Sequence, residues 1–290
     1  MASSLLVTTP DLTPPEYKSQ WKPIVEDSET KSYSYYLPYS TTSTTNNFAT
    51  REQLDRWFHT LSSLEDDETA WSDAHYQGEL LLRKTAWVVL DDRCTCEYGY
   101  SDTWQPISKS QALQLVVQEI TAAVTACCGG CATSINSCNL NYYPQGGGVG
   151  FHADDEFLFD GRRRPTRIIS LSLGAAPSNN SSNKDWGARK FLIRPQKDTP
   201  EDDVQDQYHD VQHEIMLRHG DLLTMEGMFQ NHYFHSVWPG DSKAYQDHHP
   251  WTQGERINLT WRTIVQHLDG SKEECRGIKC PLSTTNNQLG

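Results

Sequence analysis

The 290-residue sequence lacks the features that would place it at a membrane or in an export route. Its apolar runs all fall well short of the roughly 20 residues that a helix needs to cross a bilayer. The first residues, MASSLLVTTPDLTPPEYK, contain neither a basic segment nor a long apolar segment, so they do not resemble a signal peptide. We therefore expect an intracellular protein, in the nucleus or the cytoplasm, with no membrane partner.

Positive charge is also scarce. Lysine and arginine together number 25, against 38 aspartate and glutamate residues, so the formal net charge is −13. A molecule of that sign does not favour phosphate binding over its whole surface. The segment GRRRPTR, residues 161–167, is the one densely basic stretch. Its arginines, Arg163 among them, either form a solvated loop or grip phosphate groups.

The cysteines show no spacing that is typical of a zinc site. They fall into three groups: Cys94 with Cys96, four cysteines between residues 127 and 138 in the pattern CC-x2-C-x6-C, and Cys275 with Cys280. Thiols of an intracellular chain stay mostly reduced, and the pattern matches no familiar zinc motif. We interpret the cysteines as structural thiols and keep a second metal site as the alternative.

Hydrophobic periodicity predicts two helices followed by a run of strands. In residues 51–64, apolar side chains such as Leu54 and Leu61 fall on one helical face. Residues 109–130 repeat that pattern, with Ser110 as a cap and two glycines at the end. From about residue 135, short apolar segments alternate with turns, as strands do. The order indicates an α+β protein with a double-stranded β-helix (jelly-roll) core and N-terminal helices packed on one sheet.

Composition divides the chain into three predicted parts. Residues 1–48 are rich in serine, threonine, tyrosine and proline, which predicts a flexible N-terminal arm. Residues 49–268 would form the folded domain, and residues 269–290 a C-terminal tail. Within the domain, the polar residues 176–188 are interpreted as an insertion in a hairpin.

The segment GFHADDEF, residues 150–157, contains the first candidate metal ligands. A non-haem Fe(II) centre takes two imidazoles and one carboxylate and leaves further positions open. His152 and Asp154 are two residues apart, so on a strand both would point to the same side. Spacing alone does not identify the second imidazole among the downstream candidates His209, His213, His219, His232, His235, His248 and His249.

The segment RINLTWR, residues 256–262, alternates polar and apolar side chains. Arg256, Asn258 and Arg262 share one face. Arginines that face inward from a strand need acidic partners, and a dicarboxylate such as 2-oxoglutarate would provide them. The alternative is the outward polar face of an edge strand.

Five motifs, taken in order, resemble the AlkB family of Fe(II)/2-oxoglutarate dioxygenases, most of all its eukaryotic alkylation-repair branch. They are NYYPQGGGVGFHADDE, SLSLG, HGDLLTMEG, HYFHSVWP and RINLTWR. The resemblance implies Fe(II) and 2-oxoglutarate as cofactors. It implies iron ligands His152, Asp154 and His235, and not the nearby His232. The 2-oxoglutarate contacts that it implies are Asn141, Tyr143, Arg256, Asn258 and Arg262.

The resemblance also implies residues near the substrate. Glu156 matches an acidic residue beside the target base, with a hydrogen bond to the backbone as the alternative role. Tyr98, Tyr100 and Trp104 fall in the substrate-lid region, where they would stack on a base or pack in the core.

The implied reaction is oxidative demethylation of N-alkylated bases in DNA or RNA, with release of succinate, CO2 and formaldehyde. A base in a duplex would have to be flipped out to react. The acidic composition favours an alternative, a 2-oxoglutarate-dependent hydroxylase or demethylase of a protein or small metabolite. A binding module without activity is the third interpretation, and the complete set of metal and co-substrate residues disfavours it.

Overall fold

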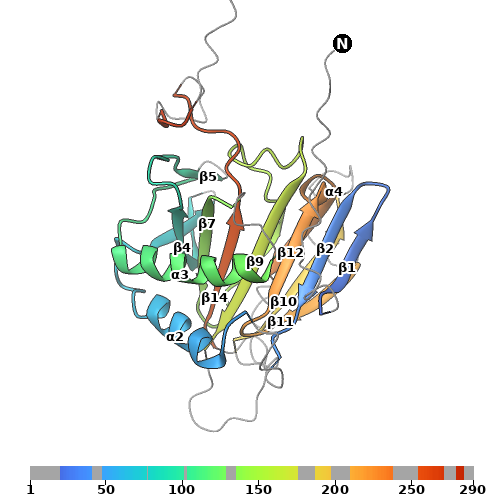
Figure 1. Ribbon diagram of the computed structural model, residues 1–290, viewed down its shortest axis with the longest axis horizontal. Helices are drawn as coiled ribbons and strands as arrows, with labels where there is room; N and C mark the ends of the chain where they lie inside the picture. The colour runs from blue at the N-terminus through green and yellow to red at the C-terminus, as the bar shows by residue number, and fades with distance from the viewer. Residues whose placement is uncertain are drawn as a thin grey trace, which may run out of the picture.

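The computed structural model describes residues 20–40, 48–76, 78–100, 103–128, 135–175, 187–196, 210–237, 254–270 and 279–283. Of the predicted insertion at residues 176–188, Gly187 and Ala188 fall within these ranges. Among the described residues, two antiparallel sheets and two longer helices make up most of the molecule (Figure 1).

The larger sheet has eight strands in the spatial order β1-β2-β12-β9-β14-β7-β4-β3. They are β1 (Lys22–Asp27), β2 (Ser32–Leu37), β3 (Ser72–Tyr76), β4 (Glu79–Val89), β7 (Ser137–Tyr143), β9 (Thr166–Gly174), β12 (Leu222–Gly227) and β14 (Arg256–Arg262). Every pairing in the sheet is antiparallel, and β14 lies between β9 and β7 near its centre.

The smaller sheet has four strands in the order β11-β10-β13-β8. They are β8 (Val149–His152), β10 (Arg189–Pro195), β11 (His213–Leu217) and β13 (Tyr233–Val237), and the short helix α4 (Phe229–His232) precedes β13. A separate hairpin consists of β5 (Tyr98–Tyr100) and β6 (Thr103–Gln105). Apolar side chains of both sheets share one buried cluster, so the sheets pack face to face. Two packed antiparallel sheets agree with the predicted jelly-roll core.

The helices α2 (Arg51–Ser62) and α3 (Gln111–Cys127) lie across one face of the larger sheet (Figure 1). Thr50 and Gln53 form a capping box at the start of α2, and the Ser110 side chain accepts a hydrogen bond from the Leu113 N–H at the start of α3. None of the helices within the described residues is long and apolar enough to span a membrane.

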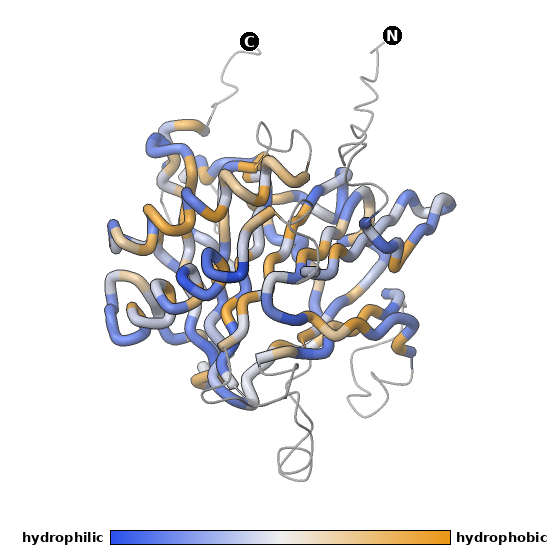
Figure 2. Tube along the Cα trace, turned by 60° about the horizontal axis from the view of Figure 1, so that its bottom comes forward, coloured by the Kyte–Doolittle hydropathy of each residue, from blue (hydrophilic) through white to orange (hydrophobic). Residues whose placement is uncertain are grey.

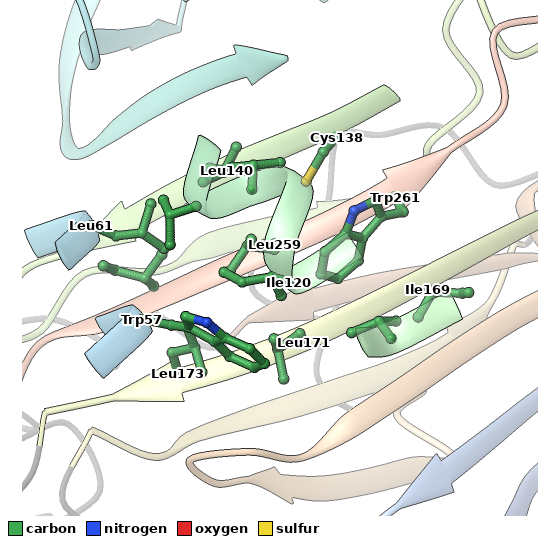
Figure 3. Packing of buried hydrophobic residues seen from close by; sticks show 14 of the residues in the cluster. Trp57, Leu61, Ile120, Cys138, Leu140, Ile169, Leu171, Leu173, Leu259 and Trp261 are labelled. Atoms are coloured by element: carbon green, nitrogen blue, oxygen red, sulfur yellow. The ribbon is translucent and has the colours of Figure 1, made fainter. Parts of the chain in front are cut away.

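The main hydrophobic core fills the space between these helices and the larger sheet. Hydrophobic and hydrophilic residues alternate along the strands (Figure 2), so each inner strand turns one apolar face to the helices. Figure 3 shows side chains of α2 and α3 against those of β7, β9 and β14: Trp57, Leu61, Ile120, Cys138, Leu140, Ile169, Leu171, Leu173, Leu259 and Trp261. The opposite, polar face of β14 is thereby directed towards the smaller sheet.

Residues 22–37 belong to the larger sheet, whereas composition placed them in a flexible arm. β2 pairs with β12 from Leu37 opposite Leu222 to Ser32 opposite Gly227. The hydroxyl of Tyr36 donates a hydrogen bond of 2.7 Å to Asp221. Tyrosine favours strands, and alternate residues of β2 are buried. The polar composition of this segment therefore hid the fact that it forms two strands at one edge of the larger sheet. The predicted boundary at residue 48 is otherwise untested, since residues 1–19 and 41–47 lie outside the described ranges.

The chain folds back after β14, where the sequence predicted a loose tail from residue 269. The Cys280 N–H donates a hydrogen bond of 2.7 Å to the Leu268 carbonyl, and Asp269 and Lys279 form an antiparallel bridge. Leu268 and Cys280 are buried in a cluster that also contains Trp87. At least residues 279–283 therefore pack onto the folded domain.

Candidate active site

The side chains of His152, Asp154 and His235 converge at the smaller sheet. β8 and β13 are antiparallel neighbours whose register places His235 opposite His152, and Asp154 follows where the chain leaves β8. Nε2 of His152 lies 3.7 Å from Oδ1 of Asp154, and Nε2 of His235 lies 3.9 Å from Oδ2. The ligand atoms of all three residues lie within 4.8 Å of one another, close enough to share one ion.

The surroundings hold each of these groups in the form that binds a metal. Nδ1 of His152 lies 2.8 Å from the Gly150 carbonyl, so it carries the proton and leaves the Nε2 lone pair available. Burial lowers the pKa of His235 to about 3, so this imidazole is neutral. Burial opposes ionisation of Asp154, but Arg262 outweighs it and the pKa of Asp154 is about 2. Two neutral imidazoles and one carboxylate are the donor set of a non-haem Fe(II) centre.

Arg262 holds the carboxylate ligand from the larger sheet. Its Nη2 donates to Oδ1 of Asp154 at 2.6 Å and its Nε to Oδ2 at 3.2 Å, which is the two-pronged geometry that suits a carboxylate. Its Nη1 lies 3.4 Å from the hydroxyl of Tyr98. The predicted contact of Arg262 with 2-oxoglutarate stays a prediction, whereas its contact with Asp154 is a role that sequence spacing did not indicate.

Arg256 offers an unpaired positive charge on the same face of β14. The residue is fully buried, and its Nε donates to the Ser172 hydroxyl at 2.9 Å. Neither terminal guanidinium nitrogen has a hydrogen-bond partner among the described residues. Burial lowers the pKa of Arg256 to about 10, the direction expected for a cation with too few partners. A carboxylate of a bound co-substrate would supply the missing acceptors.

The other predicted co-substrate residues surround Arg256. The register of β14 with β7 sets Arg256 opposite Tyr143 and Asn258 opposite Asn141, and Tyr143 lies with its ring centre 5.4 Å from the Arg256 guanidinium carbon. Asn258 is fixed by hydrogen bonds of 2.8 Å to the Ser170 hydroxyl and 2.9 Å to the Leu171 carbonyl. The structure thus gathers all four residues at one place, although β14 is a central strand and not an edge.

Arg189 is a second buried cation that the sequence analysis missed. It donates hydrogen bonds to four backbone carbonyls, those of Pro144, Gly147, Ala188 and Gly254. Burial, together with the positive charge of Arg256, lowers the pKa of Arg189 to about 10. These hydrogen bonds join three segments of the chain, so the contacts of Arg189 indicate a structural role. The strand motif RKFLIRP did not indicate this role.

Glu156, which is partly buried, and Tyr98, which is buried, form a hydrogen-bonded pair beside the metal ligands. The Tyr98 hydroxyl donates a short hydrogen bond to Oε1 of Glu156, and Oε2 has no partner among the described residues. Burial raises the pKa of Glu156 to about 7, although Arg262 acts in the opposite direction. Tyr98 itself is 4% exposed and stacks on Trp87, with ring centres 5.1 Å apart. Its contacts therefore match the core-packing alternative.

The remaining predicted substrate residues lie further out. Tyr100 and Trp104 are partly buried against the cluster that contains Tyr98. Arg163 is exposed, in the loop that follows the metal-binding segment. In the same loop Arg162 pairs with Asp155, and at the start of β9 Arg167 lies 3.7 Å from Glu226.

The other described histidines do not join the metal ligands. His213 lies on β11, His232 contacts Asn231 in α4, and His219 accepts a hydrogen bond from the Gly174 N–H at 3.0 Å. His209, His248 and His249 lie outside the described residues. The register of β13 with β8 places His235 opposite His152, and the spacing of residues in the sequence could not reveal this register.

Comparisons with known proteins agree with this site. Residues 41–262 match the family described as the 2OG-Fe(II) oxygenase superfamily. The chain is 32% identical over 144 residues to the DNA oxidative demethylase ALKBH2 of Arabidopsis thaliana, and 36% identical over 140 residues to the alpha-ketoglutarate-dependent dioxygenase alkB homolog 3 of Bos taurus. These matches cover 45% and 48% of this chain but 38% and 40% of the two relatives, less than half of their length.

A solved structure titled "The structure of OsALKBH1" aligns with 79% of this chain and 96% of its own, at 17% identity and a TM-score of 0.44. The family match and the two curated relatives confirm the AlkB resemblance that the motifs indicated.

Proposed function

Because the chain belongs to the 2OG-Fe(II) oxygenase superfamily, we propose that it catalyses oxidative demethylation of N-alkylated bases in DNA or RNA. The observation that carries the proposal is the pairing of two sites across the sheets. The smaller sheet presents two neutral imidazoles and a carboxylate within reach of one ion. The larger sheet presents the buried, incompletely paired cation of Arg256.

Each sheet would hold one cofactor. His152, Asp154 and His235 would hold Fe(II), which with 2-oxoglutarate and O2 supplies the oxidising power to hydroxylate a C–H bond. Arg256 would bind the far carboxylate of 2-oxoglutarate, and Asn141 and Tyr143 would orient the same molecule from β7. Arg262 keeps Asp154 ionised and fixes the position of its carboxylate, which would bind the Fe(II).

The substrate class is supported by chemistry and by the relatives. A hydroxylated N-methyl group loses formaldehyde spontaneously and restores the amine, so no further catalytic group is needed. The two curated relatives carry the names DNA oxidative demethylase and alkB homolog 3. Glu156, partly buried beside the metal ligands and with one oxygen unpartnered among the described residues, would accept a hydrogen bond from a base amino group.

A mass-spectrometric assay tests the proposal. The iron-loaded protein is incubated with 2-oxoglutarate and oligonucleotides, as DNA and as RNA, that carry 1-methyladenine, 3-methylcytosine or 6-methyladenine. Loss of a methyl mass that requires 2-oxoglutarate is the expected result. 5-methylcytosine serves as a control, because its methyl group is attached to carbon and would not leave as formaldehyde.

Two outcomes would overturn parts of the proposal. Release of succinate with no change in any oligonucleotide would move the substrate to a protein or small metabolite, which the net charge of −13 favours as the second candidate. Demethylation that persists in His152→Ala would contradict the assigned metal site.

A further inference from the structure

A second group of metal-binding side chains lies between the loop after β4 and the C-terminal segment. Its members are Cys94, Cys96, His267 and Cys280. Their sulfur atoms lie 3.7, 3.4 and 3.5 Å from Nδ1 of His267, and the sulfurs of Cys280 and Cys94 are 4.0 Å apart. The cysteines are at most 4% exposed. The group shares no residue with the proposed iron site.

These separations are those of a zinc coordination sphere. A tetrahedral ion with Zn–S bonds of about 2.3 Å and a Zn–N bond of about 2.0–2.1 Å sets its sulfur ligands about 3.8 Å apart and its nitrogen about 3.5 Å from each sulfur. The distances around His267 and between Cys94 and Cys280 agree with that tetrahedron to within about 0.2 Å. Three thiolates and one imidazole are also a donor set of closed structural zinc sites.

A disulfide would explain the group less well. A sulfur–sulfur bond is about 2.05 Å long, so the 4.0 Å between Cys94 and Cys280 is far too great. One such bond would also leave Cys96 and His267 unexplained. The backbone instead supports thiolates: the Thr95 N–H donates to Cys280 at 3.4 Å and the Leu268 N–H to Cys96 at 3.5 Å. Such outer hydrogen bonds orient and stabilise metal ligands.

We propose that Cys94, Cys96, His267 and Cys280 form a structural Zn²⁺ site that fastens the C-terminal segment to the loop before β5. The two segments are distant in sequence, and one ion would join them at four points. The site also adjoins the active site, because the Cys96 carbonyl accepts a hydrogen bond of 2.9 Å from the Trp87 indole, on which Tyr98 stacks. Zinc would thereby stabilise the positions of Trp87 and Tyr98, and Tyr98 donates a hydrogen bond to Glu156.

Counting zinc in the full-length protein tests this proposal independently of catalysis. His152→Ala/His235→Ala removes two candidate iron ligands, so zinc cannot occupy that site instead. After equilibration with zinc and gel filtration, this variant should retain one zinc per chain. Adding Cys280→Ser should reduce zinc by at least about tenfold, because a closed site needs four ligands. Adding Cys127→Ser, at a buried cysteine outside the group, should leave it unchanged.

Cobalt(II) provides a readout that does not require every variant to fold. Wild-type protein loaded with cobalt should show a thiolate-to-cobalt charge-transfer band, which only cysteine ligands produce, together with the intense visible absorption of tetrahedral cobalt. Absence of the charge-transfer band, or equal zinc retention with and without Cys280→Ser, would overturn the proposal. So would a disulfide between Cys94 and Cys280 in the freshly isolated protein.

Discussion

At the scale of single residues, charge pairing explains which side chains are buried. Asp154 is a buried acid that Arg262 compensates from the opposite sheet. Arg256 lies six positions earlier on the same strand and lacks such a partner at its terminal nitrogens among the described residues. The difference indicates that Arg262 pairs with a carboxylate of the protein itself, whereas Arg256 is available to pair with the carboxylate of a bound ligand.

The two neighbouring histidines around β13 provide a matched test of the metal site. His235→Ala removes a ligand, so we expect loss of stoichiometric iron binding and of 2-oxoglutarate-dependent succinate formation. His232→Ala should keep both, since the His232 side chain contacts Asn231 and does not reach the cluster. Iron content and succinate yield are measured on the same preparations. Equal loss in both variants would point to general damage and not to a ligand.

Arg256→Gln tests the co-substrate site. Hydrogen bonds to charged groups contribute about 1.5–3 kcal/mol, so the KM for 2-oxoglutarate should rise roughly 10- to 100-fold. Arg164→Gln, at an exposed position, is the control and should leave that KM within about twofold. An unchanged KM in Arg256→Gln would remove the residue from the binding site.

Much of the site could be predicted from the sequence because its residues lie in short motifs. The pair His152 and Asp154 stood out by spacing, and Arg256 by its place in an alternating strand. His235 could be chosen through family resemblance alone, since spacing did not separate it from six other histidines. The contact between Arg262 and Asp154 could not be foreseen, because it depends on how the two sheets face each other.

At the scale of elements, β14 is the strand on which fold and site both depend. Its apolar residues Ile257, Leu259 and Trp261 lie in the core beneath α2 and α3. Its polar residues face the smaller sheet and carry the site. A substitution on the apolar face of β14 should therefore lower stability, and a substitution on its polar face should lower activity.

Truncation of one core side chain tests the first of these roles. Leu259 is fully buried, so Leu259→Ala should lower the free energy of unfolding by about 2–5 kcal/mol, through lost burial and the cavity that remains. Leu115 is 58% exposed on α3, and Leu115→Ala should change the free energy of unfolding by less than about 0.5 kcal/mol. Urea denaturation measures both. A similar small change in the two variants would mean that the core can collapse around the gap.

Helices and inner strands were predictable where apolar periodicity is strong. The capped helices after Thr50 and Ser110 lie where helices were predicted, and the strands from β7 onward lie in the region predicted to contain strands. The predicted order of helices before strands was wrong, because β1 to β6 precede α3. β2 was missed because serine and tyrosine alternate there without an apolar stripe, and β1, KPIVED, has only two aliphatic residues, Ile24 and Val25. The order of strands in a sheet is set by distant pairings, such as β2 with β12, which local patterns do not contain.

At the scale of the whole molecule, net negative charge limits how nucleic acid can bind. Of the four arginines at residues 162–167, one pairs with Asp155 and another lies against Glu226. Arg163 and Arg164 remain exposed. Phosphate contacts should therefore be few, and recognition should rest mainly on the base.

The salt dependence of oligonucleotide binding measures those contacts. Each phosphate contact on a single strand contributes about −0.7 to the slope of log K against log salt, so contacts from Arg163 and Arg164 predict a slope of about −1.4. Arg163→Ala should make it shallower by about 0.7, whereas Arg56→Ala, on α2 and paired with Glu119, should not. A slope several times steeper would reveal a basic surface that these residues do not account for.

Stability should also depend on pH through His219, which lies between β9 and α2. Burial lowers its pKa to about 4, from an ordinary value of 6.5. Between pH 6.5 and pH 4, His219 is therefore protonated in the unfolded chain but neutral in the folded chain. Protonation thus favours the unfolded chain, so the free energy of unfolding should fall as pH drops from 6.5 to 4. The loss is on the order of 2–3 kcal/mol. His219→Asn should flatten that part of the profile in chemical denaturation, and an unchanged profile would contradict the assignment.

The position of Arg256 and Arg262 on one strand has a consequence for how this protein can diverge. At about 3.4 Å per residue, six positions set the Cα atoms of the two arginines roughly 20 Å apart, and pairing on both sides of β14 fixes that backbone spacing. One inserted residue would turn every later side chain of β14 to the wrong face. β14 should therefore keep its seven residues in every lineage that retains the site.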